Sequence, residues 1–169
     1  MPKRGDIVFI DTNAIAAAHR VRVWGAVRNA FHLVTATTCV EEATRPNRAG
    51  DVLVDKTADQ LTAELDVRAA DDAMRFALVE RLGDTVVLDP GERDLLALAL
   101  AAGVRVWWLC GPDKAALRAL HCLGWADHMI SVEEIAQMAG APARGLEPQE
   151  TNRWLAEKRT KLKLGDTLI

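Results

Sequence analysis

The sequence predicts an α/β protein whose core is a mainly parallel β-sheet. Short apolar runs rich in Val, Ile, Leu and Trp alternate along the chain with longer runs of helical periodicity. Strand-like runs separated by helical segments are typical of parallel strands, with helices packing on both faces of the sheet. With 169 residues, of which 50% are hydrophobic and 27% charged, the chain is large enough for one globular domain with a proper core.

The boundaries of the elements follow from the apolar pattern and from the residues that start and stop helices. The expected strands are residues 6–10, 32–36, 85–88, 104–109 and 128–130. The expected helices are residues 13–31 with a break at Gly25, then 37–45, one or two within 57–83, and 89–103, 113–124, 131–140 and 151–164. Residues 141–150 have the composition of a linker. We therefore expect a main domain over residues 1–140, and a linker with a basic helical extension over residues 141–169.

Composition excludes several classes of protein. The three cysteines, Cys39, Cys110 and Cys122, are odd in number and form no CxxC pair, so we expect no disulfide framework and a reducing, cytoplasmic location. No apolar run is long enough to cross a membrane, and no secretory segment follows the opening "MPKRGD". His121 and His128 flank Cys122 without a common zinc-binding spacing.

Acidic residues follow several of the expected strands. Ligands of open parallel sheets bind outside the carboxyl ends of the strands, so these acids are expected to meet at one edge of the sheet. They are Asp11, Glu41, Glu42, Asp89, Glu92, Asp94 and Asp113. Any one of them alone is more often a helix cap, because an acid at a helix N-terminus stabilises it by roughly 0.3–1 kcal/mol. Four strand ends that each deliver a carboxylate to one edge indicate a functional site.

Capping patterns separate the acids with a structural role from the others. In "DPGE", Asp89 is expected to cap the next helix and Glu92 to close a capping box. In "TCVE", Thr38 and Glu41 are expected to do the same. The acids left over are Asp11, Glu42, Asp94 and Asp113, with Glu41 and Glu92 as alternates.

Four carboxylates at one edge would repel one another, and without a cation some of them would hold protons with raised pKa values. Oxygen-only ligands suit a hard divalent ion, Mg²⁺ or Mn²⁺. Two such ions are able to activate a water molecule and to stabilise the leaving oxygen of a phosphodiester. The pattern therefore predicts a metal site with phosphodiester chemistry.

Four segments together resemble the PIN domain, a family of metal-dependent nucleases that mostly cut RNA. They are "FIDTNAI", "TTCVE", "GERDLLALALAAGV" and "GPDKAALRAL", and the match in order and spacing covers roughly residues 5–135. The resemblance implies a PIN-like three-layer α/β/α sandwich with a mainly parallel central sheet, to which this chain adds a C-terminal helix. It also implies that Asp11, Glu42, Asp94 and Asp113 hold the metal and carry out catalysis, with Thr12 and Asn13 in support.

The resemblance also implies partners. The family includes VapC-type toxins of type II toxin–antitoxin pairs, so it implies an RNA substrate, an antitoxin protein as a possible partner, and a homodimer. Basic residues that could contact RNA include Arg45, Arg48 and the run Lys158, Arg159, Lys161 and Lys163. The net charge of −3 does not by itself indicate a nucleic-acid-binding protein.

The same fold class has two alternatives to a nuclease, a phosphatase and a catalytically inactive module. A phosphatase of the haloacid-dehalogenase kind would need a second aspartate two positions after Asp11, where Asn13 stands. A catalytically inactive module, which keeps the acids as helix caps and binds a partner or RNA, stays open. An absence of metal binding would favour that module.

Overall fold

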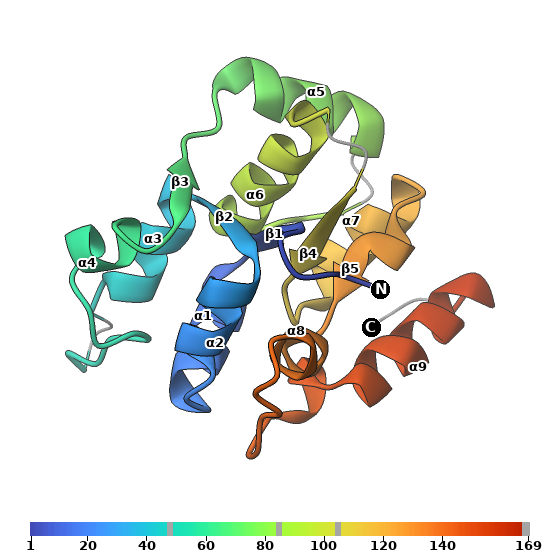
Figure 1. The fold of residues 1–169 in the computed structure, drawn as a ribbon. Helices are drawn as coiled ribbons and strands as arrows, with labels where there is room; N and C mark the ends of the chain where they lie inside the picture. Colours follow the sequence, from blue (N-terminus) through green and yellow to red (C-terminus); the bar gives the residue numbers. More distant parts are fainter. Residues whose placement is uncertain (47–48, 84–85, 104–105, 167–169) are drawn as a thin grey trace.

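The computed structural model describes residues 1–46, 49–83, 86–103 and 106–166, and it confirms the predicted α/β class. In these residues five strands form one sheet in the order β3-β2-β1-β4-β5, and all the pairings are parallel (Figure 1). The strands are β1 (Ile7–Ile10), β2 (His32–Ala36), β3 (Asp66–Arg68), β4 (Trp107–Cys110) and β5 (Met129–Ile130).

The central strand β1 is apolar on both sides because helices cover both faces of the sheet. Val8 and Ile10 belong to one hydrophobic cluster, and Phe9, which points the opposite way, belongs to the other. Strand β1 pairs with β2 on one side and with β4 on the other, so that Ile7 lies level with both His32 and Trp107. The parallel register brings the ends of these strands to the same edge.

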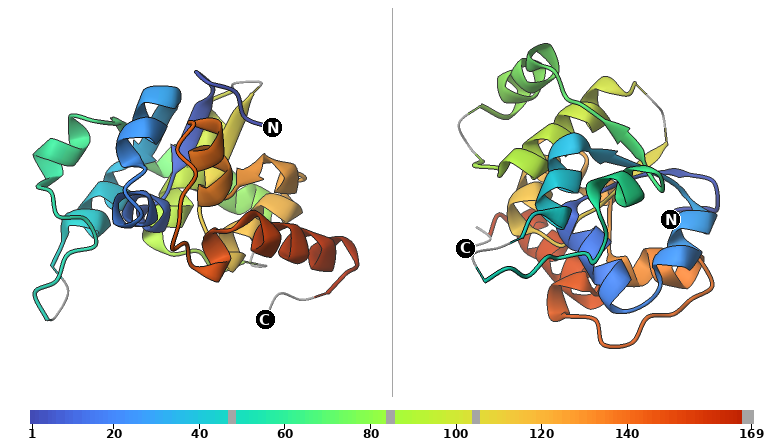
Figure 2. Two further views of the ribbon diagram at one scale, coloured as in Figure 1. Left: turned by 60° about the horizontal axis from the view of Figure 1, so that its bottom comes forward. Right: turned by 90° about the vertical axis from the view of Figure 1, so that its left-hand side faces the viewer.

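Helices form a layer on each face of the sheet, as expected for a three-layer sandwich (Figure 2). One face is covered by α1 (Thr12–Arg20), α2 (Trp24–Ala30) and α8 (Val132–Met138). The other is covered by α5 (Asp72–Leu82), α6 (Pro90–Ala101), α7 (Lys114–Cys122) and α9 (Asn152–Lys163). Helices α3 (Thr37–Thr44) and α4 (Ala58–Thr62) lie near β2 and β3, and two 3-10 turns cover Ala126–His128 and Pro148–Glu150.

One predicted strand is wrong, and another strand was missed. Of the expected strand at 85–88, residue 85 lies outside the described residues, and residues 86–88 pair with no strand. Val86 and Leu88 instead pack on the second hydrophobic cluster, while Val87 is exposed. The alternation of buried and exposed side chains in this segment therefore comes from the connection between α5 and α6 and not from a strand. The missed strand, β3, lies inside a segment predicted as helix. Its three residues pair with the otherwise free edge of β2, an interaction that local periodicity does not reveal.

The break in the first long helix also differs from the prediction. Gly25 lies inside α2, and the chain turns instead between α1 and α2, where Arg22 has a φ of 62°. This backbone conformation is rare for a residue with a side chain. The turn separates α1 from α2, and both helices pack on the same face of the sheet.

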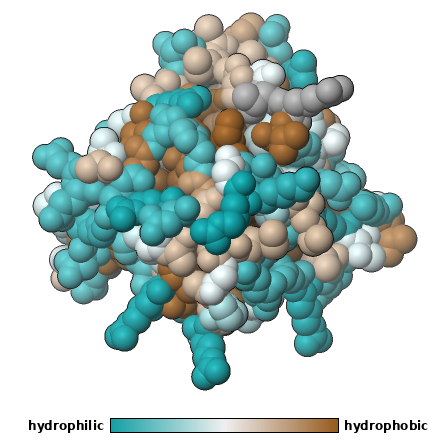
Figure 3. Space-filling view, viewed as in Figure 1, coloured by the Kyte–Doolittle hydropathy of each residue, from teal (hydrophilic) through white to brown (hydrophobic). Residues whose placement is uncertain are grey.

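The C-terminal extension packs against the second layer. Leu155 and Leu162 of α9 are buried in the second cluster, and Arg159 donates hydrogen bonds to the carbonyl oxygens of Ala126 and Met129. Hydrophilic side chains cover most of the face seen in Figure 3, and hydrophobic ones gather near α5 and the adjoining part of α6. Across the described residues, no helix combines the length and the apolar character needed to cross a membrane.

Candidate active site

A small acidic pocket lies beside the carboxyl ends of the central strands. Its volume is about 160 Å³, and it is lined by Asp11, Thr12, Asn13, Cys39, Glu42, Leu53, Asp89 and Glu92. Strand β1 is flanked by β2 on one side and β4 on the other, and chain order reverses there. Open α/β sheets bind ligands at this kind of topological switch point.

Asp11 ends β1 and caps α1 at the same time. Its Oδ1 accepts a hydrogen bond from the Ala14 backbone N–H at 2.7 Å, and the residue is only 4% exposed. Its Oδ2 lies against the backbone of Gly111, where a Cβ atom would come within 3.0 Å. A side chain at position 111 would crowd this carboxylate, so glycine keeps the second oxygen accessible.

The environment of Asp11 disfavours its charged form. Its pKa is raised from the ordinary value of 3.8 to about 7, chiefly by burial, which the backbone hydrogen bond from Ala14 opposes only in part. The negative charges of Asp113, Asp89 and Glu42 contribute to this rise. A bound cation would remove this penalty by compensating the charge.

Glu42 reaches the pocket from α3 and is oriented by the neighbouring helices. The Thr12 hydroxyl donates a hydrogen bond to Glu42 Oε2 at 2.9 Å. At the start of α6, a Cβ on Gly91 would lie only 2.6 Å from the same oxygen. The alternate Glu41 is exposed on the outer side of α3, where its carboxylate lies 3.8 Å from the Arg45 guanidinium.

Glu92 lies in the pocket even though it also closes the predicted capping box. Its backbone N–H donates to Asp89 Oδ1 at 2.8 Å, and its Oε2 accepts from the Asp89 N–H at 3.3 Å. The pKa of Glu92 is raised from 4.5 to about 9, chiefly by burial and then by the charge of Asp113 and a hydrogen bond with it. Its part in the capping box therefore does not keep Glu92 out of the pocket.

Asp94, the predicted third acid, is turned away from the pocket. Two helical positions separate it from Glu92, which corresponds to a rotation of about 200° around the helix axis. It is 1% exposed and forms a two-point ion pair with Arg75 of α5, with distances of 2.7 Å and 2.9 Å. The Arg75 guanidinium lowers the pKa of Asp94. Asp94 therefore joins α5 to α6.

Asp113 caps α7 just after β4. Its Oδ1 accepts hydrogen bonds from the N–H groups of Ala115 at 2.5 Å and Ala116 at 3.3 Å. Its charge acts on both Asp11 and Glu92, so it lies beside the acidic pocket. The structure thus brings Asp11, Glu42 and Glu92 together in the pocket wall with Thr12, Asn13 and Asp89, and Asp113 lies beside them.

The predicted cap of α3 is wrong. Helix α3 starts at Thr37 after Ala36, without a side-chain cap, and the Thr38 hydroxyl is buried without a hydrogen-bond partner among the described residues. The prediction that Glu41 is used in a capping box, which left Glu42 for the site, is therefore wrong in its reason. Glu41 stays out of the pocket because its side chain lies on the exposed side of α3.

Basic side chains of α9 form contacts within the protein itself. Lys158 and Lys161 lie 3.3 Å and 3.4 Å from the carboxylate of Glu157 on the same helix. Arg159 is half-buried and bonded to backbone carbonyls, and the candidate Arg48 lies outside the described residues. We therefore assign the basic run of α9 no part in the pocket.

The acidic pocket has the chemistry of a site for a hard divalent ion. Four carboxylates line it, two of them with raised pKa values, and Gly91 and Gly111 leave space beside Glu42 and Asp11. The Cys39 thiol also lines the pocket, but burial raises its pKa to about 11, so it stays neutral. Within the described part of the chain, no three acidic, histidine or cysteine side chains already stand in a metal-binding arrangement. Binding would therefore draw the carboxylates closer together.

No protein-family model and no curated protein matches this sequence.

Proposed function

We propose that this protein is a Mg²⁺- or Mn²⁺-dependent endoribonuclease that hydrolyses RNA phosphodiester bonds. The observation that carries the proposal is the convergence of four acids from β1, α3, α6 and the start of α7 at the sheet's switch point. They are Asp11, Glu42, Glu92 and Asp113. Glu92 takes the place that the sequence predicted for Asp94.

The charge balance of the pocket supports a metal. The pKa values of Asp11 and Glu92 are about 7 and about 9, so both carboxylates hold protons over part of the neutral range when no cation is present. A divalent ion takes the place of such protons, because it supplies the positive charge that burial otherwise denies these groups. When bound, such an ion polarises a phosphodiester oxygen and lowers the pKa of a water molecule.

The other residues of the pocket position these acids. Asp11 and Asp113 are fixed by backbone N–H groups at the first turns of α1 and α7. Thr12 holds one oxygen of Glu42 through a hydrogen bond of 2.9 Å. Asn13 stands at the mouth with an exposed amide, which is suited to orient a water molecule or a phosphate oxygen. RNA is proposed as the substrate because of the resemblance to the PIN domain.

The test compares two acids of the same helix. Purified wild-type protein is incubated with a fluorescently labelled single-stranded RNA, with Mg²⁺ or Mn²⁺ and with a chelator. We expect cleavage that requires the metal, and a loss of about a hundredfold or more in Glu92→Gln. Asp94→Asn serves as the matched control and is expected to cut RNA at the wild-type rate per folded molecule.

The opposite result would reassign the site. If Asp94→Asn abolished cleavage and Glu92→Gln did not, the acid from α6 would be wrongly assigned. If the folded wild type cut no RNA and gained no thermal stability from either metal, the catalytically inactive module would replace the nuclease. Circular dichroism of each variant shows that the comparison is made on folded protein.

A further inference from the structure

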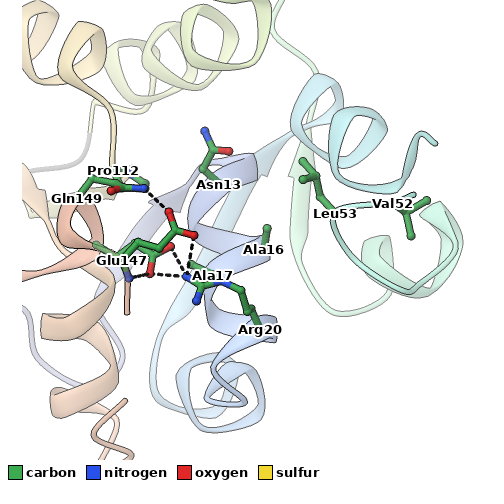
Figure 4. Close-up of a pocket in the computed structure, with 10 residues that line it drawn as sticks. Asn13, Ala16, Ala17, Arg20, Val52, Leu53, Pro112, Glu147 and Gln149 are labelled. Atoms are coloured by element: carbon green, nitrogen blue, oxygen red, sulfur yellow. Dashed lines mark hydrogen bonds and ion pairs between the residues drawn. The ribbon is translucent and has the colours of Figure 1, made fainter. Parts of the chain in front are cut away.

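A second and larger pocket adjoins the acidic one, and the two share Asn13 and Leu53 in their walls. This side pocket has a volume of about 430 Å³, within the range of about 300–1,000 Å³ that is typical of small-ligand sites. Figure 4 shows its arrangement. Helix α1 forms the floor, and Val52 and Leu53 form an apolar wall on one side. The polar wall on the other side is formed by Glu147, Gln149 and Glu150.

One ion pair builds the polar wall. The Arg20 Nη2 lies 2.6 Å from both carboxylate oxygens of Glu150, and its Nη1 donates to the Gly145 carbonyl oxygen at 2.8 Å. Glu150 is only 5% exposed, and its Oε2 also accepts from the Glu147 backbone N–H at 2.7 Å. This ion pair and the hydrogen bond to Gly145 hold residues 145–150 against α1.

Glu147 is the third charged group of this wall, and Arg20, Glu150 and Glu147 together carry a net charge of −1, because one guanidinium is shared by two carboxylates. The Glu147 side chain is 55% exposed, and its nearest carboxylate oxygen is 3.9 Å from Arg20. The Gln149 amide donates a hydrogen bond to Glu147 Oε2 at 2.5 Å, which holds this carboxylate at the rim. The carboxylate also accepts the backbone N–H of Glu150 in a capping box, so two of its roughly four acceptor sites are used within the loop. Because the wall keeps one net negative charge, an anion such as a phosphate is disfavoured here and a group rich in hydrogen-bond donors is favoured.

We propose that the side pocket is a base-binding subsite that selects guanine next to the cleaved phosphodiester of the RNA. This inference rests on the proposed ribonuclease function. A carboxylate presents two acceptor oxygens side by side. Among the four RNA bases, only guanine presents two neighbouring donors, N1–H and the N2 amino group, on its Watson–Crick edge, the edge that single-stranded RNA readily exposes.

The remaining walls fit the rest of the base. Guanine O6 lies beside N1–H and needs a donor, which the amide N–H groups of Gln149 or Asn13 are able to supply. Leu53 and Ala16 offer apolar surface to the plane of the base. A base here would be continuous with a phosphodiester in the acidic pocket, because the two pockets share a wall.

The experiment uses RNA oligonucleotides that differ at a single base beside the cleaved bond. Guanosine is compared with inosine, which lacks only the N2 amino group, and with adenosine, cytidine and uridine. We expect the wild type to prefer guanosine to inosine by about tenfold, the discrimination of one good two-point contact. Glu147→Gln replaces one acceptor oxygen by a donor and is expected to lose this preference. Glu157→Gln, which removes an acid that lines neither pocket, is expected to keep it.

A binding measurement distinguishes a failure of the base subsite from a failure of the proposed ribonuclease function. The same oligonucleotides are titrated onto Asp11→Asn and onto Asp11→Asn carrying Glu147→Gln, with fluorescence anisotropy as the readout. If the wild type cleaves RNA without preferring guanosine, or if Glu147→Gln keeps the preference, the base subsite is refuted while the nuclease stands. In that case Glu147 suits a cationic side chain of a protein partner better.

If no RNA is cleaved but Asp11→Asn still binds guanosine more tightly than inosine through Glu147, the nuclease fails and the subsite stands. If RNA is neither cleaved nor bound, both proposals fall.

Discussion

Replacing Asp11 by Asn is expected to stabilise the metal-free protein above about pH 4, with the full effect from about pH 7 upward. The folded-state pKa of Asp11, about 7, lies above its ordinary value of 3.8, so the native state binds the proton more tightly than the unfolded state. Stability is therefore lost as pH rises from about 4 to about 7. At about 1.4 kcal/mol per pKa unit, the loss is of the order of 4 kcal/mol.

Asparagine avoids this loss without removing the cap. Its side-chain oxygen accepts the same hydrogen bond from Ala14 N–H that Asp11 Oδ1 accepts at 2.7 Å. For a chain of this size, a gain of about 4 kcal/mol raises the melting temperature by about 10 °C. Thermal unfolding of the wild type and Asp11→Asn is followed with a chelator present from pH 4 to pH 8. The two curves are expected to coincide near pH 4 and to separate progressively above it.

A matched control exists at the start of α5. Asp71 caps that helix through the Met74 N–H at 2.8 Å, as Asp11 caps α1, but Asp71 is exposed. Asp71→Asn is expected to change stability by less than about 0.5 kcal/mol at every pH. If Asp11→Asn behaved like Asp71→Asn, the argument from burial would be refuted.

Adding metal provides the second half of the test. An ion that binds only the folded state stabilises it by mass action, by about 2.7 kcal/mol at a hundred times its dissociation constant. A few millimolar Mg²⁺ or Mn²⁺ should therefore raise the melting temperature of the wild type and narrow its gap to Asp11→Asn. A shift of equal size in the variant would show that the ion binds elsewhere.

Three further predictions concern individual contacts. Asp94→Asn is expected to lower the denaturation midpoint in urea because the variant removes the buried carboxylate that pairs with Arg75 and leaves Arg75 only the exposed Asp72, and an unchanged midpoint would contradict this role. Glu42→Gln is expected to slow RNA cleavage about a hundredfold, whereas the same change at its exposed neighbour Glu41 leaves the rate unaltered, as single-turnover assays would measure. Glu150→Gln removes the charge that pairs with Arg20, so limited proteolysis should cut residues 141–150 faster; equal cleavage rates would show that the ion pair does not hold this loop.

The central strands were predictable because their signal is local. The apolar runs at 7–10 and 32–36 have the length and composition of buried strands, and the structure places β1 and β2 there. The helix from Pro90 was predictable for the same reason, since the capping box and Pro90 lie within four consecutive residues. In contrast, β3 has only three residues, two of them charged, and it is a strand because the edge of β2 lies beside it.

Neighbouring residues along the chain did not reveal which acid of α6 enters the pocket. The prediction of Asp94 assumed that a carboxylate engaged in a helix cap has no further role. Asp11 and Glu92 each use a carboxylate oxygen in a helix cap and also line the pocket, and Asp113 caps α7 beside it. Capping and site formation coincide because both occur at the first turn of a helix that follows the edge of the sheet.

The sequence by itself determined the α/β class, the positions of the central strands, and the edge of the sheet at which the acids gather. These features depend on periodicity and on neighbours within a few residues, so they can be read along the chain. Only the tertiary structure decided that Glu92 enters the pocket while Asp94 pairs with Arg75, 19 positions earlier in the chain. It alone also placed Arg20 against Glu150 and so formed the side pocket. Such pairings depend on which helix faces pack together, and that is settled by contacts between distant segments.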